Sequence, residues 1–383
     1  MLKTEETSID NNTFPSQQDS VQSTLRLTRT PGVGPIVYSE LIQHFGSAAN
    51  VFKATAAELG QLSGVGPKLV SAILGPYASA TVTSIMKTCQ SHNIDVIERF
   101  ESGYPERLSE IYDPPSVLYS RGKMFPADNL SIAIVGSRHA TRYGIKIASQ
   151  LARGLSMAGI TIISGLARGI DAAAHQAALE AGGRTIAVLG GGHLKLYPPD
   201  HAALANEIAS NGAVISESPP DSPPRSGSFP RRNRIVSGLS LGVIVVEAAQ
   251  RSGALISARL AMEQGREVFA VPGRIDNRMS RGCHKLIQDG AKLVNSIDDV
   301  LEELGPLATP IRTDDSAEIR NPAELKLTEQ ERTILNSIET TPTLIDSIIS
   351  LTNIPAARVM STISILEMRS LIQRVSGTSV IRR

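Results

Sequence analysis

Two glycine-containing turns in the middle of the chain have the composition of a phosphate-binding site. The first, Gly136-Ser137-Arg138, follows the apolar run Ile132-Ala-Ile-Val135 and precedes a helical pattern. A turn between a strand and a helix presents backbone amides and the positive end of the helix dipole to an anion. Gly136, Ser137 and Arg138 are therefore candidate phosphate contacts, although a solvated surface arginine is the alternative for Arg138.

The second turn, Ser164-Gly-Leu-Ala-Arg-Gly-Ile-Asp171, joins the next apolar run to another helical pattern. Its glycines allow a ligand to approach the backbone closely. The candidate contacts in this turn are Ser164, Gly165, Arg168 and Gly169. Because the carboxyl ends of parallel strands meet at one edge of a sheet, we expect the two turns to form one anion-binding rim.

Asp171 and His175 lie four residues apart, which places both on one helix face. The spacing suits a metal-ligand pair or a structural pair at the helix start, where the dipole favours Asp. No third ligand follows at a useful spacing, so we expect a structural pair and no metal. The dinucleotide fingerprint G-x-G-x-x-G is missing after Val135, and we expect no bound cofactor.

The highest local concentration of positive charge is Arg225-Ser-Gly-Ser-Phe-Pro-Arg-Arg-Asn-Arg234, with four arginines, one phenylalanine and no acidic residue. Arginines neutralise phosphates and an aromatic ring stacks on any base, so the run predicts binding of a single strand with little sequence preference. The candidate contacts are Arg225, Phe229, Arg232, Asn233 and Arg234. The alternative is a solvated basic helix start with Phe229 in the core.

Two more segments are expected near the same edge of the sheet. Gly190-Gly-Gly192 and Pro198-Pro199 end a predicted strand and should border the groove. Val246-Glu247 ends another strand before Ser252-Gly253. A glutamate in that place suits a catalytic base or a ribose contact, so an enzymatic role of Glu247 stays open.

The elements that position these residues are strands alternating with amphipathic helices, the pattern of an α/β fold with a Rossmann-like parallel sheet. The predicted strands are Ile132–Val135, Thr161–Ser164, Thr185–Leu189, Ala213–Ser216, Val243–Val246 and Val268–Val271, with Lys292–Val294 as a possible edge. Most are apolar nearly throughout, so helices should cover both faces of the sheet.

Composition divides the 383 residues into several parts. We expect a disordered leader (1–24), a helical domain (25–103), the Rossmann-like domain (104–305), a linker (306–326) and a winged-helix-like domain (327–383). The helical domain repeats one signal, Thr30-Pro-Gly-Val-Gly-Pro35 and Leu62-Ser-Gly-Val-Gly-Pro67, which is typical of helix-hairpin-helix turns that bind phosphates or only pack. Three helical periods and a hairpin turning at Gly377 suggest the winged helix.

Bulk properties exclude some classes of protein. The formal net charge is +1, so any nucleic-acid surface must be a local concentration of charge. Two cysteines are too few for a disulfide framework, and the chain has no run of about 18 apolar residues and no signal-peptide pattern. We therefore expect a cytoplasmic protein that does not insert into a membrane.

Together, these motifs resemble the DNA-processing protein A family, also called DprA or Smf. The resemblance rests on Gly136-Ser-Arg138, Ser164–Ala172, Phe229-Pro-Arg-Arg-Asn-Arg234, Val246-Glu-Ala248 with Ser252-Gly253, and Val268-Phe-Ala-Val-Pro-Gly273. It implies a homodimer that binds and protects single-stranded DNA, displaces single-strand-binding protein and loads the RecA recombinase during natural transformation. We also expect that the protein is not an enzyme, because the turn that would position a substrate for Glu247 is missing.

Two positions depart from the family pattern. Ser226 stands where the family has a basic residue, with Arg225 beside it, and His284 stands where it has an asparagine. The competing class is a phosphoribohydrolase on a related Rossmann fold with Glu247 as its base, but the Gly-Gly-x-Gly-Thr turn of those enzymes is absent. A third class is a sequence-specific duplex binder that uses the winged helix.

Overall fold

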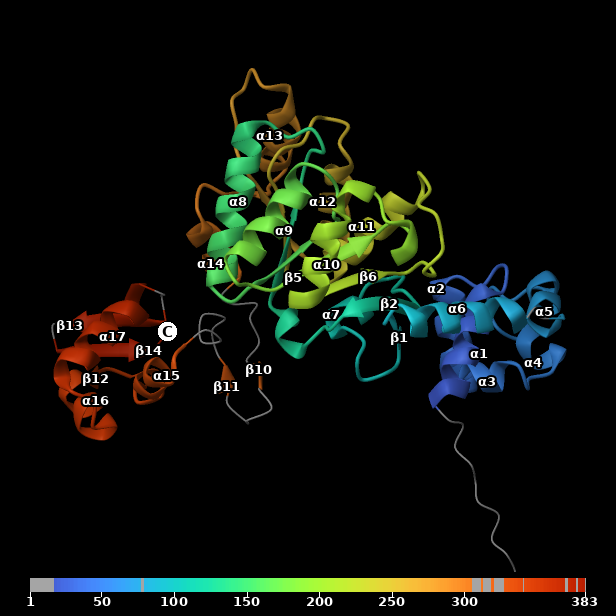
Figure 1. Cartoon of the computed structure of the whole chain (residues 1–383), viewed down its shortest axis with the longest axis horizontal. Coiled ribbons are helices and arrows are strands. Elements are labelled where there is room, and N and C mark those ends of the chain that lie inside the picture. Colours follow the sequence, from blue (N-terminus) through green and yellow to red (C-terminus); the bar gives the residue numbers. More distant parts are fainter. Residues whose placement is uncertain are drawn as a thin grey trace, which may run out of the picture. The chain divides into compact units, whose positions relative to one another are not determined.

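The computed structural model describes residues 17–76, 79–304, 311–312, 318–319, 327–339, 341–368, 371–376 and 378–382. The chain divides into two compact units (Figure 1). The first comprises residues 1–102 with 113–118, and the second residues 103–112 with 119–383. The predicted Gly377 turn and most of the predicted linker lie outside the described residues.

The first unit is helical, as the sequence predicts. Its elements are α1 (Gln17–Arg29), α2 (Pro35–Phe45), α3 (Ala48–Val51), α4 (Ala56–Gly60), α5 (Pro67–Leu74), α6 (Ser79–Ser91) and β1 (Asp95–Glu98). Gly34 and Gly66 cap α2 and α5, each of which has proline in its first turn. Helix α1 begins at Gln17, eight residues before the predicted start at Leu25, because Leu25 and Leu27 are its buried residues and the polar residues before them continue the helix.

The second unit contains a mostly parallel sheet, in which the strand order is β2-β6-β5-β4-β3-β7-β8-β9. The strands beyond β1 are β2 (Val117–Gly122), β3 (Ser131–Val135), β4 (Thr161–Ser164), β5 (Thr185–Leu189), β6 (Ala213–Ser216), β7 (Gly242–Val245), β8 (Glu267–Ala270) and β9 (Lys292–Leu293). All pairs from β6 to β9 are parallel and β2 pairs antiparallel with β6. This confirms the predicted fold class and makes the sheet mixed at one side.

Helices cover both faces of this sheet, as its apolar strands require. One face carries α8 (Arg142–Met157), α9 (Ile170–Glu180), α10 (Ala202–Asn211) and α14 (Ile297–Leu304), whose buried residues share two hydrophobic clusters with the strands. The remaining helices are α7 (Glu106–Ser109), α11 (Ser228–Gly238), α12 (Gly253–Glu263) and α13 (Arg281–Gln288), with η1 (Pro126–Asn129), η2 (His193–Lys195), η3 (Pro199–His201) and η4 (Arg278–Ser280). Of these, α11 and α12 contact each other, β5 and β7.

The C-terminal residues form a winged helix around their own core. It consists of α15 (Glu329–Asn336), α16 (Ile345–Thr352), α17 (Ala356–Met368) and a sheet of β12 (Thr343–Leu344), β14 (Ser379–Arg382) and β13 (Ile372–Ser376) in that order. Two short strands, β10 (Ile311–Arg312) and β11 (Glu318–Ile319), pair within the predicted linker. β12 was not predicted, because a strand of two residues is too short to show a pattern of apolar residues.

Within the described residues, no single helix is long and apolar enough to cross a membrane. The pair α16 and α17 passes a test of length and composition together, with a bend of 117° between the helices. Several of their apolar side chains, including Ile348 and Ile363, are fully buried in the winged-helix core. That core accounts for the apolar character of the pair.

Candidate nucleic-acid interface

A groove of about 540 Å³ lies where the strand order of the sheet reverses. Strand β3 is followed in the chain by β4, β5 and β6 on one side, and β7, on its other side, begins the return. Loops after parallel strands diverge at such a point and leave a crevice beyond the carboxyl ends, where ligands bind. The groove is lined by residues after β3, β4 and β7 and by the starts of α11 and α12.

The turn after β3 supplies one wall of this groove. Gly136, Ser137 and Arg138 all line it, as predicted from the sequence. Among the described residues, no acceptor pairs with the backbone N–H of Ser137 or Arg138, or with the Arg138 guanidinium. These amides and the exposed Arg138 side chain are therefore available to an anion.

The turn after β4 has a different role from the one predicted. The buried Asp171 carboxylate accepts hydrogen bonds from the amides of Gly165 (3.1 Å) and Ala167 (3.3 Å), so those donors are already used. The Ser164 hydroxyl donates to the Ile134 carbonyl at 2.6 Å and is fully buried. Gly165 and Ala167 line the groove, but Ser164 does not. Burial raises the pKa of Asp171, while Arg232 and the two amides oppose that shift.

Two further residues of this turn also differ from the prediction. Gly169 has a positive φ of 79°, and a Cβ there would lie 2.2 Å from the Ser137 carbonyl oxygen. It allows the two turns to pack together and does not line the groove. Arg168 forms an ion pair of 2.6 Å with Asp200 and lines a smaller cavity beside the groove.

Helix α11 carries the basic run and divides its side chains between two faces. Phe229, Arg232, Asn233 and Val236 line the groove, spaced by three or four residues as one helix face. Arg231 and Arg234 lie on another face, where both contact Glu217 Oε1, at 2.9 and 2.7 Å. Arg234 is 4% exposed. This corrects the prediction that Arg234 contacts the DNA strand. The sequence of a basic run does not show which face of the helix is buried.

Arg232 is the buried cation of the site. Its side chain donates to the Val188 carbonyl and packs against Gly165, where a Cβ would lie 2.2 Å from Nη1. It is 6% exposed, and its Nε has no partner among the described residues. Burial lowers its pKa to about 10, while the Asp171 carboxylate opposes the shift and Arg138 adds to it. Arg232 therefore stays charged at neutral pH, at the lining of the groove.

Phe229 separates the groove from a smaller cavity of about 140 Å³. The ring is half-buried and packs on Gly190, with Tyr197 edge-on at 5.8 Å between centroids. The guanidinium carbon of Arg138 lies 5.1 Å from the ring centroid. The ring packs inward and also lines both cavities, and its stacking on a base stays a prediction.

The remaining predicted contacts lie at the edge of the groove. Asn233 donates from Nδ2 to the Gly253 carbonyl at 3.3 Å, which ties α11 to the start of α12. Ser226 lines the groove, whereas Arg225 is exposed and outside the lining, so it does not replace the missing basic residue in this conformation. The start of α12 was not predicted as a phosphate site. The adjacent Ser252 and Gly253 were the available signal.

Glu247, the candidate catalytic base, is buried and has a structural role in this fold. It is 2% exposed, and its two oxygens accept from the Thr141 amide (2.8 Å) and hydroxyl (2.6 Å) at the start of α8. His284, the second departure from the family pattern, has Nε2 at 2.9 Å from the Gly273 carbonyl. An imidazole nitrogen there fixes the loop after β8, a task that an asparagine amide also suits.

Asp171 and His175 do not form a pair. His175 Nδ1 lies 2.7 Å from the hydroxyl of Thr185, which itself donates to the Ile162 carbonyl, so Nδ1 carries the proton. Burial lowers the pKa of His175 to about 3. Within the described residues, no group of three metal-ligating side chains occurs.

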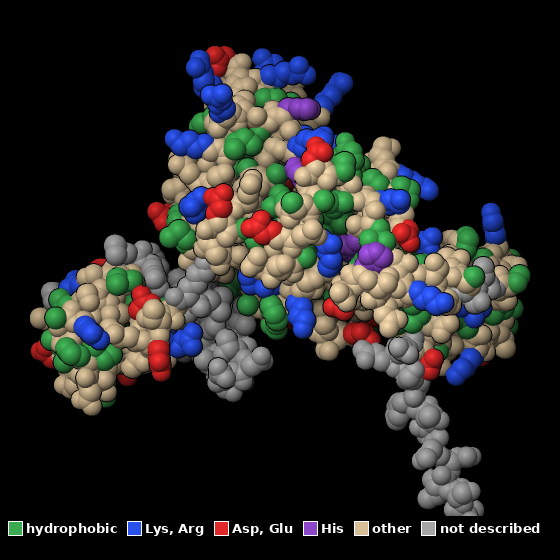
Figure 2. All heavy atoms as spheres, viewed as in Figure 1, with side chains coloured by type: hydrophobic (Ala, Val, Ile, Leu, Met, Phe, Trp, Pro, Cys, Tyr) green, Lys and Arg blue, Asp and Glu red, His purple; other side chains and the backbone are tan. Residues whose placement is uncertain are grey.

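Basic side chains concentrate at the end of the sheet that carries the groove. Figure 2 shows Lys and Arg gathered over the part of the second unit that contains α13 and the adjoining loops. The exposed basic residues that follow β3, β7 and β8 include Arg138, Arg142, Arg251, Arg274, Arg278, Arg281 and Lys285. Of these, Arg274 pairs with Asp276 and Lys285 pairs with Asp289. A net charge of +1 thus conceals a local excess of cations.

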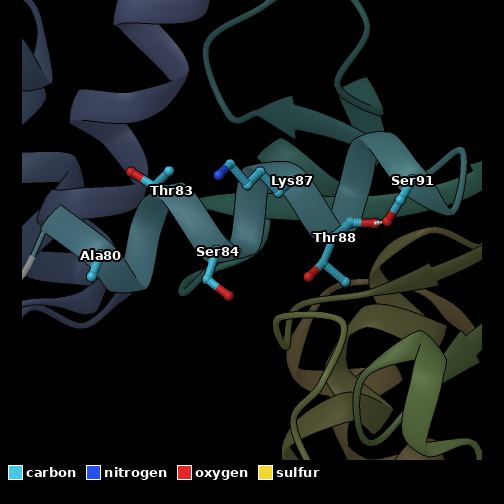
Figure 3. Close-up of a pocket in the computed structure, with 6 residues that line it drawn as sticks. All are labelled: Ala80, Thr83, Ser84, Lys87, Thr88 and Ser91. Carbon is cyan, nitrogen blue, oxygen red and sulfur yellow. Dashed lines mark hydrogen bonds between the residues drawn. The ribbon is translucent and has the colours of Figure 1, made fainter.

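The first unit offers a second hollow of about 610 Å³ along α6, drawn in Figure 3. All six lining residues belong to that helix. In Figure 3, Thr83 and Lys87 leave the helix on one side, and Ser84 and Thr88 on the other. The side chains do not converge on a ligand, so the groove in the second unit is the better candidate.

Three family models match successive parts of the chain. The family model described as DNA recombination-mediator protein A matches residues 95–305, a DprA winged helix domain matches 318–378, and a DprA-like N-terminal HHH domain matches 18–58. "Protein Smf" of Synechocystis is 33% identical over 391 residues, covering 94% of this chain and 98% of that protein. "DNA processing protein DprA" of Bacillus subtilis is 44% identical, covering 57% of this chain and 74% of that protein.

Solved structures show the same likeness. DNA processing protein A from Streptococcus pneumoniae superposes with a TM-score of 0.64 and 36% identity, covering 74% of this chain and 97% of that one. The protein from Helicobacter pylori, whose structure is described as giving insights into its single-stranded DNA binding mode, has a TM-score of 0.51 and 33% identity. The matched region covers 56% of this chain and 97% of the Helicobacter pylori chain.

Proposed function

The chain belongs to the DprA/Smf family, and we propose from this premise that it binds single-stranded DNA along the groove at the reversal of the strand order. The observation that carries the proposal is the convergence of Arg138, the buried Arg232 and the unpaired amides of Ser137 and Arg138 on one crevice with an aromatic wall. The titles and names of the relatives support a DNA-processing role in transformation.

The shape and chemistry of the groove favour a single strand over a duplex. Arg232 is 6% exposed and lies against Gly165, so only a narrow part of a ligand reaches it. A phosphate on a flexible strand fits that requirement, whereas a duplex holds its phosphates on a stiff, wide surface. The half-buried Phe229 beside it offers a stacking contact that every base satisfies. Binding with little sequence preference follows.

Binding without covalent chemistry is the second part of the proposal. The phosphoribohydrolase alternative requires Glu247 as a base, but both of its oxygens bond Thr141 at the start of α8. A Cβ at Gly144 would lie 2.5 Å from the Glu247 carboxyl carbon, so the helix also covers the side chain. A carboxylate so enclosed fixes a helix start and cannot approach a substrate.

The family resemblance extends the proposal to partners. We infer a homodimer that protects incoming single strands, displaces single-strand-binding protein and hands the strand to RecA. A site that accepts any base and releases its ligand as salt rises suits such a transfer. Light scattering at micromolar concentration tests the dimer, and strand exchange by RecA on a strand coated with single-strand-binding protein tests the transfer. A monomer, or no stimulation of RecA, would count against these two parts alone.

A binding titration tests the central proposal. The dissociation constants of an oligothymidine and of a duplex of equal length are measured at several salt concentrations for wild type, Arg138→Ala and the matched control Arg153→Ala. Arg153 is exposed on α8, pairs with Glu180 and does not line the groove. We expect preference for the single strand, and for Arg138→Ala a weaker affinity with the logarithmic salt slope reduced by roughly 0.7.

Wild-type affinity in both variants, with the fold intact by circular dichroism, would place the strand elsewhere on the chain. Tighter binding of one duplex sequence than of the oligothymidine would favour duplex recognition through the winged helix.

A further inference from the structure

Leu166, in the turn after β4, has an unusual backbone conformation. Its φ is 57°, in the left-handed region that a residue with a Cβ seldom adopts. Its side chain is fully buried and packs with residues of β5, β6 and α10. Such a conformation is unfavourable by itself and persists only where the surrounding structure fixes it. The turn therefore needs a restraint from outside its own backbone.

Asp171 supplies this restraint from the first turn of α9. One of its oxygens, Oδ2, accepts hydrogen bonds from the amides of Gly165 at 3.1 Å and Ala167 at 3.3 Å. These are the two residues on either side of Leu166, so a single carboxylate oxygen holds both ends of the left-handed residue. Asp171 is 6% exposed, and its own position is fixed by the helix.

The Arg232 guanidinium lies on this restrained turn. A Cβ built on Gly165 would lie 2.2 Å from Arg232 Nη1 and 2.4 Å from Nη2, so the guanidinium is in direct contact with the Gly165 backbone. Its other contact is the Val188 carbonyl in β5. The place of the Arg232 charge in the groove therefore depends on where the Gly165 peptide lies.

We propose that Asp171 is a positioning residue for single-strand binding: it fixes the turn after β4 and, through Gly165, sets where the Arg232 guanidinium meets a phosphate. The inference rests on the proposed function, because it requires a strand in the groove. Asp171 also lines the groove, where its negative charge repels the phosphates of a ligand. Positioning and repulsion act on affinity with opposite signs, so an experiment separates them.

The variant Asp171→Asn removes the negative charge but keeps a side-chain oxygen. Loss of the charge alone would tighten the binding of an oligothymidine. A neutral acceptor holds the two amides less firmly than a carboxylate does, and its NH₂ group offers no attraction to Arg232. We therefore expect weaker binding, by up to about 5-fold at about 0.1 M salt, with the logarithmic salt slope reduced by up to roughly 0.7, the share of one phosphate contact.

Arg232→Ala provides a second measurement. In that background Asp171→Asn should not weaken binding further, because the guanidinium that Asp171 positions is gone. Titration to saturation with a tight-binding strand gives the concentration of active protein for each variant, so partial unfolding does not imitate a weaker affinity.

The matched control is Asp200→Asn, which removes the same charge from an exposed carboxylate. Asp200 pairs with Arg168 of the same turn and lines neither cavity. This variant should bind at least as tightly as wild type. An equal loss of affinity in Asp200→Asn would count against a role that depends on Gly165.

Affinity in Asp171→Asn equal to or tighter than that of wild type would overturn the positioning role and leave the proposed function standing. A further loss of affinity when Asp171→Asn is added to Arg232→Ala would do the same, because Asp171 would then not act through Arg232. Failure of wild type to bind the oligothymidine would overturn both.

Discussion

Arg232 holds a positive charge in a place that is 6% exposed, where a charged group is costly. Burial lowers its pKa to about 10, and the nearby Asp171 carboxylate limits the shift. Because 10 is well above neutral pH, the guanidinium is charged before any ligand binds. The Val188 carbonyl, the Asp171 carboxylate and the open groove replace the water that would surround an exposed guanidinium.

Arg234 illustrates a different use of arginine on the same helix. It is 4% exposed and shares Glu217 with Arg231, so we expect Arg234→Ala to lower the free energy of unfolding by about 3 kcal/mol. The slope of affinity against salt should not change, because no phosphate contact is lost. Urea denaturation and the salt titration measure the two effects. A flatter salt slope with unchanged stability would show that Arg234 reaches the strand after all.

At the scale of the elements, the packing of α11 against the turn after β4 depends on the absence of a side chain at Gly165. A Cβ there would lie 2.2 Å from Arg232 Nη1, so Gly165→Ala should push the guanidinium out of its place. We expect weaker single-strand binding and a salt slope reduced by roughly 0.7, with the fold retained because the displaced atoms end a flexible side chain.

The control for this prediction is Gly227→Ala, which caps α11 and has no atom within 4 Å of its added Cβ. It should bind like wild type. Equal affinity in both variants and wild type would mean that the position of Arg232 does not matter to the ligand.

The sequence predicts the parallel strands closely and the site less well. The runs Thr161–Ser164, Thr185–Leu189 and Ala213–Ser216 match β4, β5 and β6 to the residue, because buried parallel strands are apolar throughout. β1, with the sequence Asp-Val-Ile-Glu, was missed since two of its four residues are charged. Arg234 and the amides after β4 have partners other than the predicted ones, because the orientation of a helix and the hydrogen bonds of Asp171 depend on neighbours distant in sequence.

At the scale of the whole molecule, buried histidines link stability to pH. Burial lowers the pKa of His175 to about 3 and that of His193 to about 4, from 6.5 in the unfolded chain. Below pH 6.5 the unfolded state binds protons at these two positions and the folded state does not, so the two histidines lower the free energy of unfolding as the pH decreases. Each histidine contributes a slope of about 1.4 kcal/mol per pH unit between its two pKa values.

We therefore expect the urea midpoint to fall between pH 6 and pH 4.5. The fall should be smaller in His175→Gln, because this variant lacks one of the two buried histidines. The exposed His139 serves as control, because His139→Gln should leave the pH dependence as it is in wild type. Circular dichroism follows the unfolding. A pH dependence that is the same in His175→Gln and wild type would show that His175 is protonated in the folded state.

The position of the groove at the reversal of the strand order also sets when it becomes complete on the ribosome. One wall, from Gly136 to Ala167, leaves the exit tunnel well before the other, which begins at Ser226 and ends at Met279. Domains fold as units during synthesis, and the strand β7 that separates these walls is made only after β6. A nascent chain that stops before residue 242 therefore lacks β7 and the groove residues from Ala249 to Met279, so its groove is incomplete.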